Sequence, residues 1–374
     1  MKWRLTKAMV LPLGGLCALV CLWKFTNVED RPATAAHQNS PQRPIPVDTL
    51  PEALNLAWDA ADIGVERITP ADNPLTEAKV QLGRKLFFDP ILSADGTVAC
   101  ASCHDPQHGF ASPDPLAIGI GNQLGRRNAP SLLNVGLGQT FFWDGRAASL
   151  EEQALEPIAN PLELGSSVGD VIKRLRAHAE YPQQFKAAFA NEGTPGEAGD
   201  ADQHVTADNL AKAIASFERV LVSHGSRVDR FRRSEFTALS NEAKQGLWLF
   251  ESKANCWKCH SGPNLTDEQF HNTGVSWGAK PTDLGHFELT QDEADRGKFK
   301  TPTLRDVART APYMHDGSIA TLEEVIEFYS KGGGKNSHLD ERIQPLNLTD
   351  EEKLHLIEYL KALAGSQDWA EGQD

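Results

Sequence analysis

The sequence has no set of apolar stretches long enough to cross a membrane repeatedly. Its longest apolar run, Ala8 to Trp23, has 16 residues and contains Pro12 and the pair Gly14-Gly15, whereas a spanning helix needs about 20 residues. Hydrophobic residues make up 40% of the chain and charged residues 24%, a balance that excludes a polytopic membrane protein and a disordered chain. The 374 residues are enough for two separate hydrophobic cores.

The chain also lacks a basic block beyond its N-terminus. It has 37 Lys and Arg against 51 Asp and Glu, which gives a formal net charge of −14. Nucleic acid is therefore not an expected partner. A surface of this charge instead favours association with a basic or neutral redox protein.

The N-terminal segment has the order of an export signal. Four basic residues flank the apolar run: Lys2, Arg4, Lys7 and Lys24. Small residues at 33–35 offer a cleavage site, so residues 1–36 are predicted to be a signal peptide or, if uncleaved, a membrane anchor. Either form predicts a periplasmic protein, in a compartment that allows disulfides. The Pro-rich residues 37–70 are predicted to be a linker.

No cysteine of the body is left over for a disulfide framework. All four belong to two C-x-x-C-H motifs: Cys100-Ala-Ser-Cys103-His104 and Cys256-Trp-Lys-Cys259-His260. In such a motif the two thiols attach to the porphyrin vinyl groups, and the adjacent His is placed to ligate iron. The doubled motif predicts two covalently bound haem c groups, with His104 and His260 as iron ligands.

A zinc site or a redox dithiol is the alternative use of these cysteines. A four-cysteine zinc site would have to unite two pairs that are more than 150 residues apart. Neither alternative explains a His directly after each pair. Haem attachment is therefore the favoured interpretation.

A weak internal repeat predicts two related domains. Glu77–Phe87 and Glu242–Phe250 each begin with Glu-Ala-Lys, end with Leu-Phe and lead to a C-x-x-C-H motif. Both have the periodicity of an amphipathic helix. We predict an N-terminal domain over residues 71–235 and a C-terminal domain over residues 236–374, each with one haem.

The rest of the pattern predicts an all-α fold with long loops. Residues 207–222 carry apolar side chains at the 3–4 spacing of a helix. A second helix is predicted at 349–363, because Thr349-Asp-Glu-Glu352 is a capping box ahead of an apolar face. No convincing alternation typical of strands occurs. Segments rich in Gly and Pro separate the helices, and such loops are commonly organised by a bound group.

Five further segments follow one another in the body of the chain: Gly125-Arg-Arg-Asn-Ala-Pro130, Phe142-Trp-Asp-Gly-Arg146, Glu152-Gln-Ala154, Pro302-Thr-Leu-Arg305 and Ala311-Pro-Tyr-Met-His-Asp-Gly317. Together with the haem motifs, they make residues 75–365 resemble the bacterial di-haem cytochrome c peroxidase family, which includes MauG and its relatives. The resemblance implies two cytochrome c-like domains with the haems near their interface. In the family, the N-terminal haem meets hydrogen peroxide and the C-terminal haem passes electrons.

The resemblance also implies the residues of the peroxide site. By family position, Glu163 is the carboxylate that moves a proton and Gln153 the amide that positions the peroxide. Phe142 and Pro157 would line the same pocket. Trp143 matches the tryptophan that relays electrons between the haems. Solvated polar residues and an ordinary core aromatic are the alternatives for these side chains.

Two positions depart from the conventional peroxidase pattern. Where conventional members have a second His ligand to the peroxidatic haem, this chain has Ile120, so the N-terminal haem is expected to be five-coordinate. His108 is the nearest substitute, only four residues after the haem motif. Where conventional members have a Met ligand to the second haem, this chain has Tyr329, as MauG-like members do. Met314 is the competing thioether, since the only other methionines are Met1 and Met9.

The family also holds a calcium ion between its domains. The matching ligands are the side chain of Asn128 and the backbone carbonyls of Thr310 and Pro312, together with water. Ligation by oxygen alone suits a hard cation. Calcium at this site is therefore implied by the resemblance.

Three functions fit these observations. The first is a peroxide-driven, MauG-like oxidation of a partner protein at an oxidisable Trp or Tyr. The second is detoxification of peroxide with electrons from a small cytochrome c or a copper protein. The third is a non-enzymatic di-haem electron carrier, which Ile120 disfavours because both irons would need two axial ligands. MauG relays electrons through a surface tryptophan just before the second haem motif, but this chain has Ala254 there; Trp248, Trp257 and Trp277 are candidate replacements.

Overall fold

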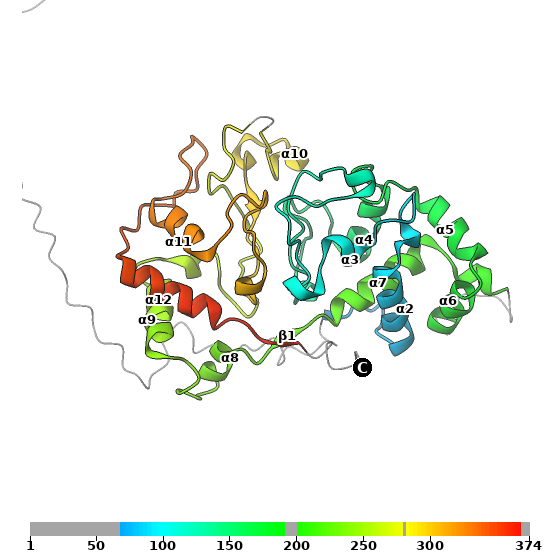
Figure 1. Cartoon of the computed structure of the whole chain (residues 1–374), viewed down its shortest axis with the longest axis horizontal. Coiled ribbons are helices and arrows are strands. Elements are labelled where there is room, and N and C mark those ends of the chain that lie inside the picture. Colours follow the sequence, from blue (N-terminus) through cyan, green and yellow to red (C-terminus); the bar gives the residue numbers. More distant parts are fainter. Residues whose placement is uncertain (1–67, 191–199, 280–281, 368–374) are drawn as a thin grey trace, which may run out of the picture. The chain divides into compact units, whose positions relative to one another are not determined.

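Figure 1 shows the computed structural model of the chain, which describes residues 68–190, 200–279 and 282–367. The predicted signal peptide or anchor, and nearly all of the predicted linker, lie outside the described residues. Within the described ranges, no helix is long and apolar enough to cross a membrane.

Helices and loops make up almost all of the described chain, in agreement with the all-α prediction. The longer helices are α2 (Glu77–Phe88), α4 (Leu150–Ala159), α5 (Val168–Ala177), α6 (Tyr181–Phe189), α7 (Ala207–Arg219), α9 (Asn241–Glu251), α11 (Leu322–Ser330) and α12 (Asp350–Lys361). The shorter ones are α3 (Cys100–Cys103), α8 (Arg227–Arg232) and α10 (Phe287–Thr290). Single 3₁₀ turns are η3 (Pro90–Leu92), η4 (Pro106–His108), η5 (Ile120–Asn122), η6 (Val135–Leu137), η7 (Ala201–His204), η8 (Cys256–Lys258), η9 (Glu293–Asp295) and η10 (Val307–Arg309).

Among the described residues, the named strands form two very short pairs, and the remaining β-pairing consists of isolated bridges. Strand β1 (Ser223–His224) pairs antiparallel with β4 (Ser366–Gln367). Strand β2 (Phe270–His271) pairs antiparallel with β3 (Phe299–Lys300). The β1–β4 pair therefore ties the segment after α7 to the segment after α12.

Hydroxyl side chains start several of the longer helices. Each of these residues accepts a hydrogen bond from the backbone N–H three positions later: Ser149, Ser240, Thr321 and Thr349. Such a cap satisfies a donor that the helix itself leaves unpaired. The predicted capping box between Thr349 and Glu352 is present. The helices predicted at 207–222 and 349–363 end slightly earlier, at Arg219 and Lys361.

A glycine sets the close approach of two helix pairs, α2 with α7 and α9 with α12. A Cβ atom on Gly83 would lie 1.9 Å from the carbonyl oxygen of Ala213, and one on Gly246 would lie 1.9 Å from that of His355. Neither position can hold a larger residue unless the backbone moves. The two glycines lie in the repeated Glu-Ala-Lys segments, so the repeat seen in the sequence is a repeat of helix packing.

The hydrophobic cores divide in the same way. Three clusters of buried side chains are drawn only from residues 82–221, and another only from residues 228–363. We call these parts of the chain the first half and the second half. They agree with the predicted pair of domains, although the border between residues 235 and 236 stays a prediction.

A closer repeat relates one loop of each half. Residues 141–147 form a loop whose first and last residues make an antiparallel bridge, and residues 313–319, 172 positions later, do the same. In both loops the second residue and the glycine have positive φ. Asp-Gly occupies the fourth and fifth places of each loop. The two halves therefore carry the same turn at corresponding places.

The repeated loops lead into equivalent helices. The sequence Ala-Ser-Leu-Glu-Glu opens α4 and Ala-Thr-Leu-Glu-Glu opens α11, each with its hydroxyl residue as the cap. Pro157 is the eighth residue of α4 and Tyr329 the eighth residue of α11. These two residues hold equivalent positions in the two halves.

Candidate haem sites and the peroxide pocket

The first C-x-x-C-H motif has the arrangement that haem attachment needs. Cys100 and Cys103 lie at the two ends of α3, unpaired with each other, and His104 follows directly. The His104 Nδ1 lies 3.0 Å from the carbonyl oxygen of Phe110, which fixes the ring with Nε2 as the nitrogen available to iron. Burial lowers the pKa of His104, so the imidazole is neutral, as ligation requires.

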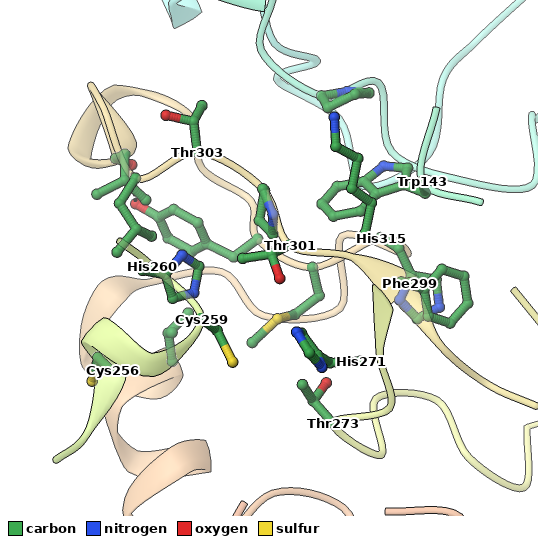
Figure 2. Close-up of a pocket in the computed structure, with 18 of the residues that line it drawn as sticks. Trp143, Cys256, Cys259, His260, His271, Thr273, Phe299, Thr301, Thr303 and His315 are labelled. Atoms are coloured by element: carbon green, nitrogen blue, oxygen red, sulfur yellow. Dashed lines mark hydrogen bonds between the residues drawn. The ribbon is translucent and has the colours of Figure 1, made fainter. Parts of the chain in front are cut away.

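The second motif repeats this geometry. Cys256 begins the turn η8 and Cys259 caps its end, and the Nδ1 of His260 lies 3.1 Å from the carbonyl oxygen of Leu265. Burial lowers the pKa of His260 to about 4. Figure 2 shows the three motif residues together on one side of the pocket that they line. The residues of both motifs therefore fit covalent haem.

The structure does not unite the four cysteines into a zinc site. Within the described ranges, the metal-type grouping is Cys259 with Asp267 and His271, whose ligand atoms lie within 4.8 Å of one another. Both ring nitrogens of His271 are already engaged, by Asp267 at 2.9 Å and by Asp340 at 2.8 Å. The zinc alternative has no support from this arrangement.

The second motif lines a cavity of about 320 Å³. Tyr329 and Met314 both line this cavity. The burial of Tyr329 raises its pKa, so in the absence of a metal the phenol keeps its proton. Both candidate ligands of the second haem are therefore at the site, and the choice between them stays a prediction.

Glu163 and Gln153 come from the segment that starts at α4. The Glu163 carboxylate accepts a hydrogen bond of 2.7 Å from the side-chain amide of Asn160, the residue that caps the C-terminus of α4. Burial raises the pKa of Glu163, although Arg146 and Asn160 counteract it. The side-chain oxygen of Gln153 is buried without a hydrogen-bond partner. A buried amide oxygen without a hydrogen-bond partner lowers the stability of the fold. The unpaired Gln153 oxygen is therefore consistent with a site where a ligand donates the missing hydrogen bond.

The loop around Ile120 lies against the first site. Its backbone N–H donates to the carbonyl oxygen of Glu163 at 2.8 Å, and the neighbouring Ile118 carbonyl lies 3.6 Å from the Cys103 sulfur. Ile120 offers no ligating atom. His108, the nearest substitute, has its Nδ1 2.9 Å from a carboxylate oxygen of Asp105 and follows His104 by only four residues.

Trp143 borders the pocket from the first half. Its indole N–H donates to the carbonyl oxygen of Asn128 at 2.9 Å, and its ring meets that of His315 edge-on with centroids 6.4 Å apart. His315 in turn stacks on Phe299 at 3.6 Å. Figure 2 shows these aromatic rings on the side of the pocket away from Cys256. Trp143 thus contacts an aromatic pair of the second half.

The three predicted calcium ligands lie around the same cavity. Asn128, Thr310 and Pro312 all line it. The Asn128 side-chain N–H donates to the carbonyl oxygen of Asp114 at 2.9 Å, which leaves the side-chain oxygen for other partners. Its backbone N–H donates to the His315 carbonyl at 2.8 Å. The donor set fits a hard cation.

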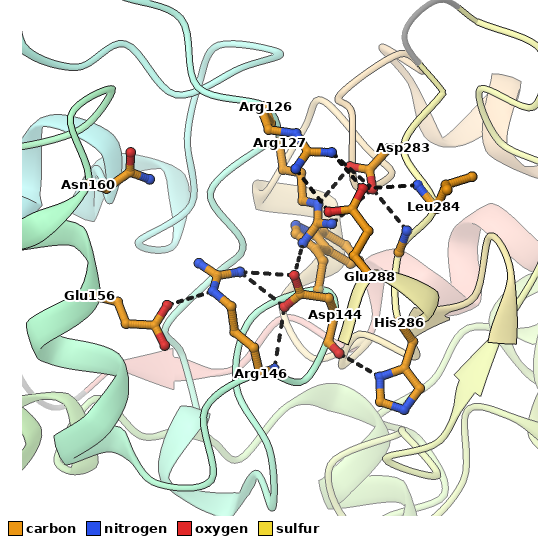
Figure 3. A network of polar contacts seen from close by, with 12 residues as sticks. Arg126, Arg127, Asp144, Arg146, Glu156, Asn160, Asp283, Leu284, His286 and Glu288 are labelled. Carbon is orange, nitrogen blue, oxygen red and sulfur yellow. Dashed lines mark hydrogen bonds and ion pairs between the residues drawn. The ribbon is translucent and has the colours of Figure 1, made fainter. Parts of the chain in front are cut away.

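A network of ion pairs near Trp143, which the sequence did not predict, joins the two halves (Figure 3). Arg127 binds both oxygens of Asp283, at 2.7 and 2.9 Å, and also Asp144 at 2.6 Å. Asp144 also accepts from Arg146 at 3.0 Å. Residues 127 and 283 are too far apart for any local pattern to pair them.

The candidate surface tryptophans differ in exposure. Trp257, between the two cysteines of the second motif, is 41% exposed. Trp248 packs against the core of the second half, and Trp277 contacts the ring of His338. Ala254 is buried in that core. Trp257 is therefore the candidate that solvent or a partner can reach most readily.

Comparison with known proteins gives one consistent result. Residues 77–237 match the family of di-haem cytochrome c peroxidases. The methylamine utilization protein MauG of Methylorubrum extorquens is 41% identical over 296 residues, which cover 79% of this chain and 80% of that protein. The cytochrome c551 peroxidase of Nitrosomonas europaea is 36% identical over 307 residues, covering 81% and 84%. The solved structure of a MauG-like protein associated with microbial copper homeostasis superimposes with a TM-score of 0.71 at 36% identity, covering 80% and 92%.

Proposed function

The chain belongs to the di-haem cytochrome c peroxidase family, and from this premise we propose that it is a MauG-like peroxidase. Hydrogen peroxide reacts at the site of Cys100 and His104. Electrons reach that site through the second haem and Trp143, and they come from a partner protein. The family implies two haem c groups, and the two C-x-x-C-H motifs are the residues that would hold them.

The observation that carries this proposal is the contrast at the eighth residue of two equivalent helices. Pro157 in α4 has no atom that can bind iron, whereas Tyr329 in α11 has a phenolic oxygen. Ile120 and His108 do not replace the missing ligand. The first site is therefore open to peroxide, and the second is closed by a side chain.

Each side chain of the first site has a separate role in the peroxide reaction. When bound, the haem iron supplies the electrons that reduce hydrogen peroxide to two water molecules, with uptake of two protons. Glu163 accepts a proton from one peroxide oxygen and returns it to the other. Gln153 orients the peroxide through its side-chain amide. Phe142 and Pro157 limit the entry of water.

Tyr329 sets the second site apart from that of a conventional peroxidase. A phenolate is a hard anionic donor, so it stabilises the oxidised metal more than a thioether does. Met314 is the alternative ligand. With Tyr329 bound, the second site suits the storage of oxidising equivalents and their delivery to a protein substrate.

A conventional cytochrome c peroxidase is the second candidate, since a relative of that kind is 36% identical. In that case a small cytochrome c or a copper protein would supply the electrons, and peroxide removal would be the purpose. The two candidates share the peroxide step and differ in the electron source. A simple electron carrier would give no task to the unpartnered Gln153 oxygen.

The calcium site and the compartment complete the proposal. The side chain of Asn128 and the carbonyls of Thr310 and Pro312 would hold one Ca²⁺ near Trp143, where it keeps the two halves in register. The N-terminal segment would direct the chain to the periplasm, with or without retention as an anchor. Covalent haem attachment agrees with export.

The spin states of the purified, fully oxidised protein test the proposal. Electron paramagnetic resonance is expected to show one five-coordinate high-spin haem and one six-coordinate haem. Tyr329→Phe should change only the six-coordinate signal. Two six-coordinate haems in the native protein would mean that a side chain closes the first site, and would contradict the proposal.

A further inference from the structure

We propose that the buried imidazole of His315 holds a carboxylate of the second haem: its Nε2–H donates a hydrogen bond to a haem propionate at the end of the cavity next to Trp143. This inference rests on the second haem of the proposed function, because it concerns how that group is held. It adds to that function a positioning residue between the second haem and Trp143.

His315 is a buried side chain with an unpaired polar atom. The residue is 4% exposed and lines the cavity of the second C-x-x-C-H motif. Its Nε2 is buried and has no hydrogen-bond partner in the protein. Leaving such a nitrogen unpaired lowers the stability of the fold. The nitrogen is therefore suited to a ligand that occupies the cavity and completes the hydrogen bond.

The position of His315 identifies the part of the haem that it faces. The vinyl groups of a haem c are bound to the two cysteines of its motif, and the two propionates lie at the other edge of the porphyrin. Figure 2 shows His315, together with Trp143 and Phe299, on the side of the pocket away from Cys256. A haem attached to Cys256 and Cys259 would thus turn its propionates toward His315.

A second unpaired polar atom lines the same end of the cavity. The Oγ1 of Thr140 is buried without a hydrogen-bond partner. The Nζ of Lys300 donates to the Thr140 carbonyl oxygen, and the backbone N–H of Lys300 donates to that of Trp143 at 2.8 Å. Lys300 also brings a positive charge to this end, where it pairs with Glu268 at 2.7 Å. Two unpaired polar atoms beside an ammonium group fit the carboxylate edge of a ligand.

Aromatic contacts hold the imidazole in place. The His315 ring stacks on Phe299 with centroids 3.6 Å apart and an interplanar angle of 12°. The Trp143 ring meets it edge-on at 6.4 Å. The guanidinium of Arg127, which binds Asp283, lies 5.5 Å from the centroid of the same Phe299 ring. Because the ring is already fixed, a hydrogen bond to a ligand costs little further side-chain freedom.

The repeat between the two halves separates the role of His315 from that of Trp143. His315 is the third residue of the loop 313–319, and Trp143 is the third residue of the loop 141–147. The indole N–H of Trp143 donates to the carbonyl oxygen of Asn128 at 2.9 Å, so the protein itself satisfies it. Of these two equivalent side chains, His315 is the one with a nitrogen left for a ligand.

The test is a redox titration of the holoprotein, followed by absorption, that determines the reduction potential of each haem. An N–H donor offsets the negative charge of a propionate, so its loss should stabilise the oxidised iron. His315→Phe keeps a flat ring on Phe299 but removes the nitrogens. It should lower the potential of the second haem by about 59 mV, a tenfold shift of a one-electron equilibrium, and leave the first haem unchanged. His315→Gln returns a donor without the ring and should restore most of the native potential.

His286→Phe is the matched control. The His286 ring stacks on Phe270 with centroids 3.9 Å apart, as His315 does on Phe299, but His286 does not line the described cavity. Its Nδ1 lies 2.7 Å from the carbonyl oxygen of Asp144, so it already has a partner in the protein. Both haem potentials should stay unchanged in this variant.

The haem content of the native protein, measured as the pyridine haemochrome, separates this inference from the proposed function. With fewer than two haems, the proposed function fails and the inference falls with it. With two haems, an unchanged second potential in His315→Phe overturns the inference alone. So does a shift in His315→Gln without one in His315→Phe, because the ring and not the donor would then matter. A shift confined to the first haem would assign the hydrogen bond to the wrong haem and would also overturn it.

Discussion

The two halves of the molecule share one local structure and differ in the side chains that it carries. Each presents a C-x-x-C-H motif, a bridged loop with two positive-φ residues, and a helix that opens with a hydroxyl cap. At the eighth residue of that helix, the first half has Pro157 and the second has Tyr329. In the proposed function, this single position separates an open site from a closed one.

The comparison shows that the repeated backbone sets the position from which a side chain could bind the haem iron. The residue type at that position decides whether an iron-binding atom is present. The residues around this position also differ between the two halves. In the proposed function, Gln153 and Glu163 of the first half bind peroxide and move its proton. The second half has Val325 at the place of Gln153 and Ser318 at the place of Arg146. On this proposal, proton transfer takes place in the first half.

The largest effect is expected from closing the open site. Pro157→His would place an imidazole where Tyr329 stands in the other half, and the first haem should become six-coordinate. The reaction with peroxide should then fall to background, as measured by rapid-mixing absorption. Pro157→Ala is the control, because it removes the ring without adding a ligand. A reactive, five-coordinate Pro157→His protein would show that the two positions are not equivalent.

Removal of the proton-carrying carboxylate should have the next largest effect. Glu163→Gln keeps the shape of the side chain but cannot accept a proton at neutral pH. The rate constant for peroxide should fall by about 10² to 10⁴, the usual contribution of a general acid–base group. Glu293→Gln, which changes a carboxylate that is 68% exposed, should leave the rate unchanged. An equal rate in the Glu163 variant would remove this residue from the mechanism.

The network that joins the halves predicts a difference between two neighbouring arginines. Arg127 is 12% exposed and binds Asp144 and Asp283, so Arg127→Gln should lower the free energy of unfolding by about 3 kcal/mol. Arg126 is 57% exposed, and Arg126→Gln should cost at most about 0.5 kcal/mol. Urea unfolding of the holoprotein measures both. Equal losses would mean that the buried pairs contribute no more than surface ones.

The same pair of variants has a defined pH dependence. Burial raises the pKa of Asp283, but the hydrogen bonds and charge of Arg127 outweigh it and hold the pKa below 3.8. A carboxylate with a depressed pKa contributes its stability above its unfolded pKa and loses it as the pH falls through the folded pKa. The gap between the native protein and Arg127→Gln should therefore narrow below about pH 4. A gap that stays constant in acid would contradict the assignment.

The smallest change is expected at the closed site. Tyr329→Met would replace a hard anionic donor by a thioether and should raise the reduction potential of the second haem by about 0.1 V, within the roughly 0.8 V range that axial ligands span. A redox titration followed by absorption measures this shift. Tyr329→Phe supplies the control, since it removes the oxygen alone. If Tyr329→Phe leaves the spectrum of the second haem unchanged, Met314 is the better candidate.

The sequence was informative where chemistry requires a fixed local spacing. The C-x-x-C-H motifs and the capping box at Thr349 are of this kind, because their residues act within one or two helical turns. The contact between Arg127 and Asp283 is different, since it joins loops 156 residues apart. The hydrogen bond from Asn160 to Glu163 spans only three residues, but no spacing rule singles out that amide. The shared Ala-Ser/Thr-Leu-Glu-Glu sequence, 172 positions apart, was the available signal that Pro157 and Tyr329 are equivalent.

The most direct test of the account is rapid mixing of the fully oxidised protein with one equivalent of hydrogen peroxide, without any reductant. An open first site predicts an immediate shift of the haem absorption band to a long-lived oxidised species. A protein that stays unchanged until one haem is reduced would contain a hidden ligand at the first site. That result would contradict the central claim that Pro157 and Ile120 leave this site open.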